Sequence, residues 1–305
     1  MSRTPEARAS VADRDCSDTT ALVTGSTSGI GREVALALGR LGAHVRVHGR
    51  DRERGRAVVS EFDSLDGTAE FHRADFASQD AVREFAATVT DSVGDAGELD
   101  LLFNNAGGYF RSARLTDDGI EYTFAVNHLA PFLLTHLLAP AMPDDGRIVT
   151  TSSGAHRQGT LDFEGLRSVD SYSGMGAYSQ SKLANILFTR ELARRVPQSA
   201  NCFHPGFVPG SAFFRDLPAP IRIPLSAASA IPGFGSSVES GAATALYLGV
   251  AEETADVTGE YFSNFSTQTP TSEGRDDDVA RRLWEVSEEM VDLSSEEALA
   301  PTATH

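Results

Sequence analysis

The chain has 305 residues, of which 26 are basic and 43 acidic, so its formal net charge is −17. Apolar residues make up 41% of the sequence, an ordinary share for a globular protein with a buried core. The acidic charge argues against a nucleic-acid partner, and the polar N-terminus is unlike a secretory signal. Two cysteines are too few for a disulfide framework. With no apolar run of about 18 residues, we expect a soluble, cytoplasmic protein that has no membrane span.

The basic residues are almost all arginine, because Lys182 is the single lysine in the chain. An acidic, lysine-poor surface suits a cytoplasm with high salt, where ions screen the repulsion among like charges. A GC-rich genome, which favours arginine and aspartate codons, explains the same composition equally well. Both interpretations stay open at this point, and both make the retained lysine a candidate functional residue.

Short β-rich runs alternate with helical patterns from about residue 20 to residue 265. The strands are expected at 21–24, 44–48, 69–73, 99–104, 147–151, 200–204 and 260–263. The helices are expected at 30–41, 79–92, 118–139, 176–195 and 238–250. This alternation predicts an α/β fold, a Rossmann-type doubly wound parallel sheet of about seven strands flanked by helices.

We expect a single domain over 19–293, between disordered ends at 1–18 and 294–305. The segment 207–237 contains five prolines and many apolar residues. Because it is too hydrophobic for a solvated linker, we interpret it as a lid over a pocket.

A glycine-rich turn, T-G-S-T-S-G-I-G at 24–31, follows the first strand and opens a helix. Glycines in such a turn let the backbone approach a pyrophosphate, and the helix N-terminus supplies N–H groups and partial positive charge. The turn therefore predicts dinucleotide binding. The residues expected to contact the cofactor here are Gly25, Ser26, Thr27, Ser28, Gly29, Ile30 and Gly31.

The end of the second predicted strand indicates which dinucleotide is bound. An acidic residue at this place selects NAD through the adenosine ribose, and a basic one accommodates the 2′-phosphate of NADP. Gly49 stands where the acid is expected and Arg50 follows it, with Arg32 after the glycine turn as a further cation. The pattern favours NADP(H) over NAD(H), although Asp51 could serve NAD.

Tyr178 and Lys182 are four residues apart and share one face of a predicted helix. An ammonium near a phenol favours the phenolate, so we expect Lys182 to bring the tyrosine pKa down from about 10 toward the working range. Ser152 and Ser153 end the fifth predicted strand, at the edge where open parallel sheets bind ligands. A serine hydroxyl there could hold a substrate oxygen beside Tyr178.

These pieces, in this order, resemble the short-chain dehydrogenase/reductase family over roughly residues 18–265. Further matching motifs are N-N-A-G at 104–107, Y-S-Q-S-K at 178–182 and H-P-G-F-V at 204–208. Finer features resemble its retinol-dehydrogenase-like branch: K-L-A-N-I-L-F-T-R-E-L-A-R-R at 182–195, G-E-Y-F-S at 259–263 and R-R-L-W-E-V-S at 281–287.

The resemblance implies an oxidoreductase that interconverts a carbonyl and an alcohol by hydride transfer. Tyr178 would be the general acid or base and Lys182 would lower its pKa and bind the nicotinamide ribose. Ser153 would orient the carbonyl, with Ser152 as the fallback, and Asn127 would hold a water of a proton relay. The remaining cofactor contacts that the resemblance implies are Asp75, Phe76, Asn104, Ala106, Gly107, Pro205, Gly206 and Val208.

The apolar lid predicts a hydrophobic small-molecule substrate. Residues expected at the substrate pocket are Ser153, His156, Tyr172, Phe213 and Phe214, and Ser211 could replace a cofactor-binding threonine of the family. The eight scattered histidines predict no metal site. The resemblance further implies a homodimer or homotetramer through the helices 118–139 and 176–195. The alternatives are an NADP(H)-binding sensor without turnover and a sugar epimerase or dehydratase.

Overall fold

The protein, here a computed structural model that describes residues 4–96, 98–208, 235–293 and 299, is built on one sheet. The strand order is β3-β2-β1-β4-β5-β6-β7-β8, and the first seven strands pair in parallel. This confirms the predicted Rossmann-type fold. The strands are β1 (Thr20–Val23), β2 (His44–Gly49), β3 (Thr68–Arg73), β4 (Leu101–Asn104), β5 (Arg147–Thr151), β6 (Ser199–His204), β7 (Tyr261–Ser263) and β8 (Ser266–Thr267).

The eighth strand was not predicted, because it is only two residues long. Asn264 and Phe265 both have positive φ angles, of 51° and 66°, and turn the chain back after β7. Such left-handed pairs match the twist of a tight hairpin. β8 therefore pairs antiparallel with β7 at the edge of the sheet.

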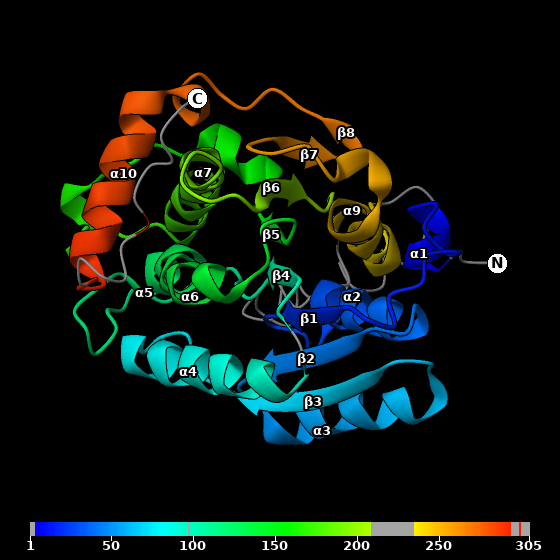
Figure 1. Ribbon diagram of the computed structural model, residues 1–305. Helices are drawn as coiled ribbons and strands as arrows, with labels where there is room; N and C mark the ends of the chain where they lie inside the picture. The colour runs from blue at the N-terminus through cyan, green and yellow to red at the C-terminus, as the bar shows by residue number, and fades with distance from the viewer. Residues whose placement is uncertain (1–3, 97, 209–234, 294–298, 300–305) are drawn as a thin grey trace.

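Helices cover both faces of the sheet (Figure 1). One face carries α2 (Gly29–Arg40), α3 (Arg52–Glu61) and α9 (Val238–Val250). The other face carries α4 (Gln79–Ala96), α7 (Gly174–Leu192) and a long helix formed by α5 (Tyr122–Phe124), a π-turn at Ala125–Leu129 and α6 (Ala130–Leu138). A last helix, α10 (Asp277–Met290), packs outside α6 and α7.

The five predicted helices are present, but sequence reasoning missed α3 and α10. α3 buries only Gly55 and Val58, so its sequence lacks an apolar stripe. α10 does carry one, since Ala280, Leu283, Trp284 and Ser287 are buried at helical spacing. That periodicity could have identified α10.

Residues 4–18 correct the expectation of a disordered N-terminal end. A short helix, α1 (Pro5–Arg8), lies against α9 and α2 (Figure 1). Both carboxylate oxygens of Glu6 accept hydrogen bonds from Arg40, at 2.7 and 3.0 Å, and Val11 is buried in the core. The segment is held by burial and by this paired charge, which its polar sequence did not reveal. The predicted tail 294–305 lies outside the described residues, apart from Leu299.

The long helix on the second face bears on the expectation that the chain has no membrane span. Its run Tyr122–Ala141 is long and apolar enough to cross a membrane, and in the described residues it is the one helix that is. However, 83% of its most apolar window is buried inside the protein. The run is apolar on all sides because it packs against the sheet, α4, α7 and α10, as a core helix does.

The same burial limits the surface that these two helices offer to the expected subunit interface, which stays a prediction. Every residue of α7 from 181 to 189 is buried within the single chain, and so is nearly all of α6. α10 covers the outer side of both helices. The exposed part of α7 is its first turn, where Met175 is 46% exposed.

Candidate active site

A cavity of about 1160 Å³ opens at the carboxyl ends of β1, β2, β4, β5 and β6. It lies where the strand order reverses, between β1 and β4, which is the usual ligand site of an open parallel sheet. The loops after these strands and the first turns of α7 form its walls.

The glycine-rich turn forms one wall of this cavity. Gly25 has a φ of +66°, and a Cβ atom there would lie 2.8 Å from the Ala106 Cα, so only glycine fits. Ser28 precedes α2 without capping it through its side chain, which leaves the first N–H groups of the helix available to a ligand. Besides Gly25, the predicted residues that line the cavity here are Thr27, Ser28, Gly29 and Ile30.

Two predicted residues of the turn support it from behind. The Ser26 hydroxyl donates to the Val23 carbonyl at 2.6 Å and accepts from the His48 N–H at 3.0 Å. A Cβ atom on Gly31 would lie 2.4 Å from the side-chain nitrogen of Asn105. Both positions therefore set the shape of the turn without forming the cavity wall, and their expected contact with the cofactor stays a prediction.

His48 at the end of β2 is a wall residue that sequence reasoning missed. Its Nδ1 accepts from the Gly25 N–H at 3.1 Å, and its ring stacks on Phe76 at 4.2 Å. Burial lowers the pKa of His48 to about 3, so the imidazole is neutral and can keep accepting this bond. The histidine thus fixes the glycine turn to the neighbouring strand.

The adenosine end of the cavity carries the residues expected to choose between NADP and NAD. A Cβ atom on Gly49 would lie 2.5 Å from the Thr27 side chain, so the position expected for an acid has no room for one. The Arg50 guanidinium lines the cavity, donates to the Tyr122 hydroxyl at 3.2 Å and lies 3.8 Å from Asp75. The Asp51 carboxylate instead accepts the N–H groups of residues 53 and 54 and caps α3.

Arg32 is not the cation that its place in the sequence indicated. Its guanidinium pairs with Glu33 at 2.6 Å and with Glu61, which directs it toward α3. Arg54, which was not predicted, lines the cavity and pairs with Asp51. The predicted residues Asp75 and Phe76 also line the cavity.

The loop after β4 follows the predicted N-N-A-G motif with one correction. Ala106 and Gly107 line the cavity as expected. The side chain of Asn104 points into the core and donates to the Thr135 hydroxyl at 2.9 Å. Its neighbour Asn105 lines the cavity and donates to the Thr24 carbonyl at 2.9 Å, which ties this loop to the glycine turn.

Ser153, Tyr178 and Lys182 come together at the opposite end of the cavity. The Tyr178 hydroxyl shares a hydrogen bond with Ser153, and only 7% of the tyrosine is exposed. Burial raises the pKa of Tyr178 to about 12, although the Ser153 hydrogen bond opposes the rise. This direction is opposite to the expected lowering by Lys182. Ser152 donates to the Lys182 carbonyl at 2.8 Å, which leaves Ser153 as the serine beside the phenol.

The Lys182 side chain is buried, and its ammonium donates to the Thr151 carbonyl at 2.9 Å. Its nitrogen lies 5.7 Å from the centre of the Tyr178 ring. Burial lowers the pKa of Lys182 to about 8, because a charged ammonium is poorly solvated there, and the nearby Cys202 opposes this only weakly.

Asn127 lies in the π-turn, behind the cavity wall. Its side-chain oxygen accepts from the Gly108 N–H at 2.9 Å, and its nitrogen donates to the Gly108 carbonyl and the Ser181 hydroxyl, both at 3.0 Å. The amide therefore fastens the β4 loop to α7. The relay water that the resemblance implied at Asn127 stays a prediction.

Two predicted substrate residues hold wall residues in place and do not themselves form the wall. His156 is fully buried, and its Nδ1 lies 2.7 Å from the Ser153 carbonyl. The Tyr172 hydroxyl donates to the Phe110 carbonyl at 2.6 Å. Three further candidates, Ser211, Phe213 and Phe214, lie outside the described residues, as does most of the expected lid 207–237.

The mouth of the cavity near Tyr178 is apolar. Pro205, Gly206 and Val208, which were predicted as cofactor contacts, line the cavity here, and sequence reasoning missed His204 and the aromatic residues after Gly108. Met175 and Phe207 also line it and are 46% and 49% exposed, which is unusual for large apolar side chains.

Comparisons with known proteins agree with this architecture. Residues 19–219 match the short chain dehydrogenase family. The chain is 37% identical to human (Homo sapiens) retinol dehydrogenase 13 over 294 residues, which cover 90% of this chain and 85% of that protein.

Solved structures give the same result. A short chain dehydrogenase from Burkholderia cenocepacia J2315 in complex with NADP superposes with a TM-score of 0.64 at 29% identity, over 80% of this chain and 95% of the other. LugOII, a promiscuous reductase that performs keto-reduction at C1 during lugdunomycin biosynthesis, superposes with a TM-score of 0.64 at 27% identity, over 81% and 96%. The chain belongs to the short-chain dehydrogenase/reductase family of oxidoreductases and is similar to its retinol dehydrogenases.

Proposed function

We propose that this protein is an NADP(H)-dependent oxidoreductase that interconverts a carbonyl and an alcohol on hydrophobic small molecules. The observation that carries the proposal is the meeting of Ser153, Tyr178 and Lys182 at one end of a cavity whose other end is a glycine-built dinucleotide cradle. The family relationship supports the reaction class.

The residues of the cradle fit a nicotinamide dinucleotide. The turn at Gly25 and the open N-terminus of α2 suit the pyrophosphate. Ala106 and Gly107 would lie along the adenosine side, and Lys182 would bind the nicotinamide ribose. When bound, the nicotinamide supplies or accepts the hydride.

Tyr178 handles the proton in this proposal. With a pKa of about 12, its phenol stays protonated at neutral pH and is ready to protonate the oxygen of a carbonyl that accepts hydride. Ser153, hydrogen-bonded to that phenol, would hold the same oxygen. Burial keeps the phenol protonated but makes it a weaker acid, so proton release would depend on the Ser153 hydrogen bond and on the Lys182 ammonium, which both favour the phenolate.

A preference for NADP(H) is supported by the adenosine end. Arg50 reaches the cavity, and the planar guanidinium suits a phosphate group. Asp51, the residue that could have served NAD, already accepts two backbone N–H groups of α3. Gly49 leaves no room for the ribose-binding acid. The apolar mouth formed by Met175 and Phe207 supports a hydrophobic substrate.

The Tyr178→Phe variant tests the proposal. NADPH binding is followed by nicotinamide fluorescence, and turnover is measured with apolar aldehydes and ketones. We expect the variant to bind NADPH as the parent does and to lose about 10²- to 10⁴-fold in kcat, the usual contribution of a general acid.

Tyr247→Phe, on the outer side of α9, is the matched control and should keep its activity. A parent enzyme that binds NADPH and reduces none of these carbonyls would favour a nucleotide sensor. A Tyr178→Phe variant as active as the parent would reject the assigned acid.

A further inference from the structure

A line of buried hydrogen bonds leads from Lys182 to the C-terminal helix α10. The Thr151 carbonyl accepts from the Lys182 ammonium at 2.9 Å and from the side-chain nitrogen of Asn185 at 3.1 Å. The same Asn185 nitrogen donates to the Asn127 carbonyl at 3.0 Å. His128 lies 3.3 Å from the Asn185 oxygen through Nδ1 and 3.0 Å from the Ser287 hydroxyl through Nε2.

The donor and acceptor of each hydrogen bond in this line follow from the backbone carbonyls of Thr151 and Asn127. Carbonyl oxygens only accept, so the Asn185 nitrogen must face Thr151 and Asn127, and its oxygen must face His128. His128 Nδ1 therefore donates, and His128 Nε2 accepts the proton of the Ser287 hydroxyl. All four side chains from Lys182 to Ser287 are at most 3% exposed, so water does not compete with these bonds.

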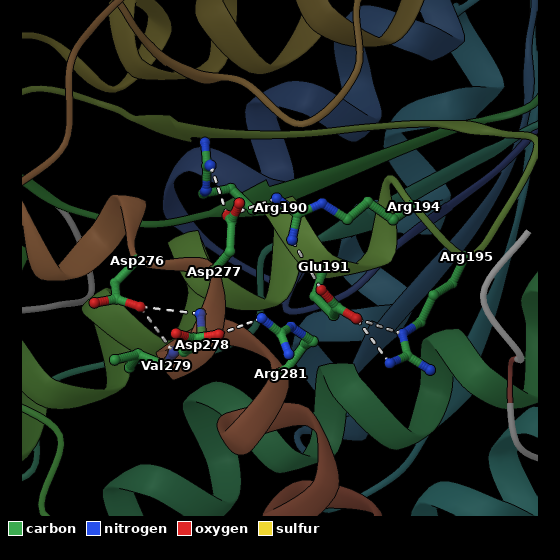
Figure 2. Close-up of polar contacts among 9 residues, drawn as sticks. All are labelled: Arg190, Glu191, Arg194, Arg195, Asp276, Asp277, Asp278, Val279 and Arg281. Atoms are coloured by element: carbon green, nitrogen blue, oxygen red, sulfur yellow. Dashed lines mark hydrogen bonds and ion pairs between the residues drawn. The ribbon is translucent and has the colours of Figure 1, made fainter. Parts of the chain in front are cut away.

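The line joins two sequence motifs whose residues, apart from Lys182, do not line the cavity. Asn185 belongs to K-L-A-N-I-L-F at 182–188, and Ser287 ends R-R-L-W-E-V-S at 281–287. Figure 2 shows how the same two helices are fastened near the start of α10, where Asp277 pairs with Arg190 and Arg194. Arg195 pairs with Glu191 (Figure 2). Its guanidinium also lies over the Trp284 ring, 4.4 Å from the ring centre.

We propose that Asn185, oriented by His128 and Ser287, is a positioning residue that holds the Thr151 carbonyl for the Lys182 ammonium. This inference rests on the proposed oxidoreductase function. One N–H of Lys182 is then fixed on the strand end, and its other two are left for ligands in the cavity. Asn185 also donates to the Asn127 carbonyl and so positions the π-turn. The Asn127 side chain in that turn accepts a hydrogen bond from the Gly108 N–H.

The titratable groups around Lys182 come from each element packed on it. They are Tyr178 on its own helix, Cys202 on β6 and His128 on the π-turn. Burial raises the pKa of Cys202 to about 12 and lowers that of His128 to about 3. Between pH 6 and 10 both are neutral, so a change in the alkaline limb of the activity profile reports on Lys182.

The test is the Asn185→Leu variant, in which a side chain of similar size lacks both polar groups. We expect kcat for carbonyl reduction to fall about 10- to 100-fold, because a misplaced catalytic group costs this much. We also expect the alkaline limb, near pH 8 in the parent, to move to lower pH by about one unit, since the Thr151 carbonyl is no longer held in place for the ammonium.

Ser287→Ala should also lower kcat and shift the alkaline limb to lower pH, but by less than Asn185→Leu. This variant provides the test if Asn185→Leu does not fold. The double variant should equal Asn185→Leu alone, because Ser287 acts through Asn185. Gln198→Leu is the matched control. Its buried amide also donates to two carbonyls, those of Ala139 and Met142, both at 3.2 Å. Its loss should lower stability and leave the pH profile unchanged.

The outcomes separate the two proposals. An inactive parent enzyme rejects the proposed function. An active parent, together with an unmoved alkaline limb in both Asn185→Leu and Ser287→Ala, rejects only the positioning role. If the losses in kcat of the two single variants multiply in the double variant, the positioning role is also rejected, because the two residues would then act independently.

Discussion

At the scale of single residues, burial sets the direction of the pKa shifts of Tyr178 and Lys182. The four-residue spacing correctly predicted that both side chains would face one site. However, it could not show that both would be buried or that the ammonium would bond to Thr151. In this environment burial disfavours the charged form of each group, so the tyrosine pKa rises and the lysine pKa falls.

Arg50 provides a residue-scale prediction of cofactor choice. The Arg50→Ala variant should bind NADPH about 10- to 100-fold more weakly, as expected when a hydrogen bond to a charged group is lost. Its affinity for NADH should change by less than about threefold, since NADH lacks the 2′-phosphate. Titrations followed by nicotinamide fluorescence measure both dissociation constants.

Arg52→Ala is the control for this prediction, because Arg52 is exposed at the start of α3 and is not among the cavity residues. Equal losses for both cofactors in Arg50→Ala would contradict the role of this arginine. Equal losses would indicate that Arg50 shapes the cavity but does not bind the 2′-phosphate.

At the scale of elements, α10 depends on its packing against α6 and α7. Trp284 is 1% exposed and contacts Phe132 and Phe188, with ring centres 5.0 and 5.9 Å away. Its indole N–H donates to Glu288 at 2.7 Å. The apolar stripe of α10 is visible in the sequence, but the surface that receives it comes from residues about 100 to 150 positions earlier.

Trp284 therefore gives the prediction for this element. The Trp284→Ala variant should lose about 3–5 kcal/mol in the free energy of unfolding, the usual cost of emptying a buried aromatic site. Chemical denaturation measures this change. Glu285→Ala, on the exposed side of the same helix, should stay within about 0.5 kcal/mol of the parent. A loss under about 1 kcal/mol for Trp284→Ala would show that α10 is only loosely attached.

At the scale of the whole molecule, the packing of α10 bears on assembly. The resemblance to the family implied association through two helices that this chain itself buries over most of their length. Opening that face for a second subunit would require α10 to leave, which would expose Trp284 and its apolar partners to water.

We predict that the protein is a monomer of 32.5 kDa in solution. Size-exclusion chromatography with light scattering measures the mass, and the Glu285→Ala variant should give the same value. A stable dimer of the parent would contradict the prediction. If a dimer formed and Trp284→Ala abolished it, α10 itself would be the interface.

The sequence by itself determined the fold class and predicted the reacting groups that the cavity brings together. These predictions rest on local patterns: alternating strands and helices, the glycine turn, and the spacing of Ser153, Tyr178 and Lys182. Such patterns depend on residues near one another in the sequence, so they can be recognised without the structure. The tertiary structure decided which of the predicted side chains line the cavity and which are buried behind its wall. Ser26, Asn104 and similar polar side chains were predicted as contacts because their positions match a motif.

Their actual partners are atoms of other elements, tens of residues away in the chain. The hydroxyl of Ser26 is taken by β1 and β2, and the amide of Asn104 by α6. Only the folded chain shows which polar atoms are satisfied internally and which stay free for a ligand. The same physical reason explains the pKa values and the hydrogen-bonded line through Asn185, because burial and hydrogen bonding are properties of packed neighbours.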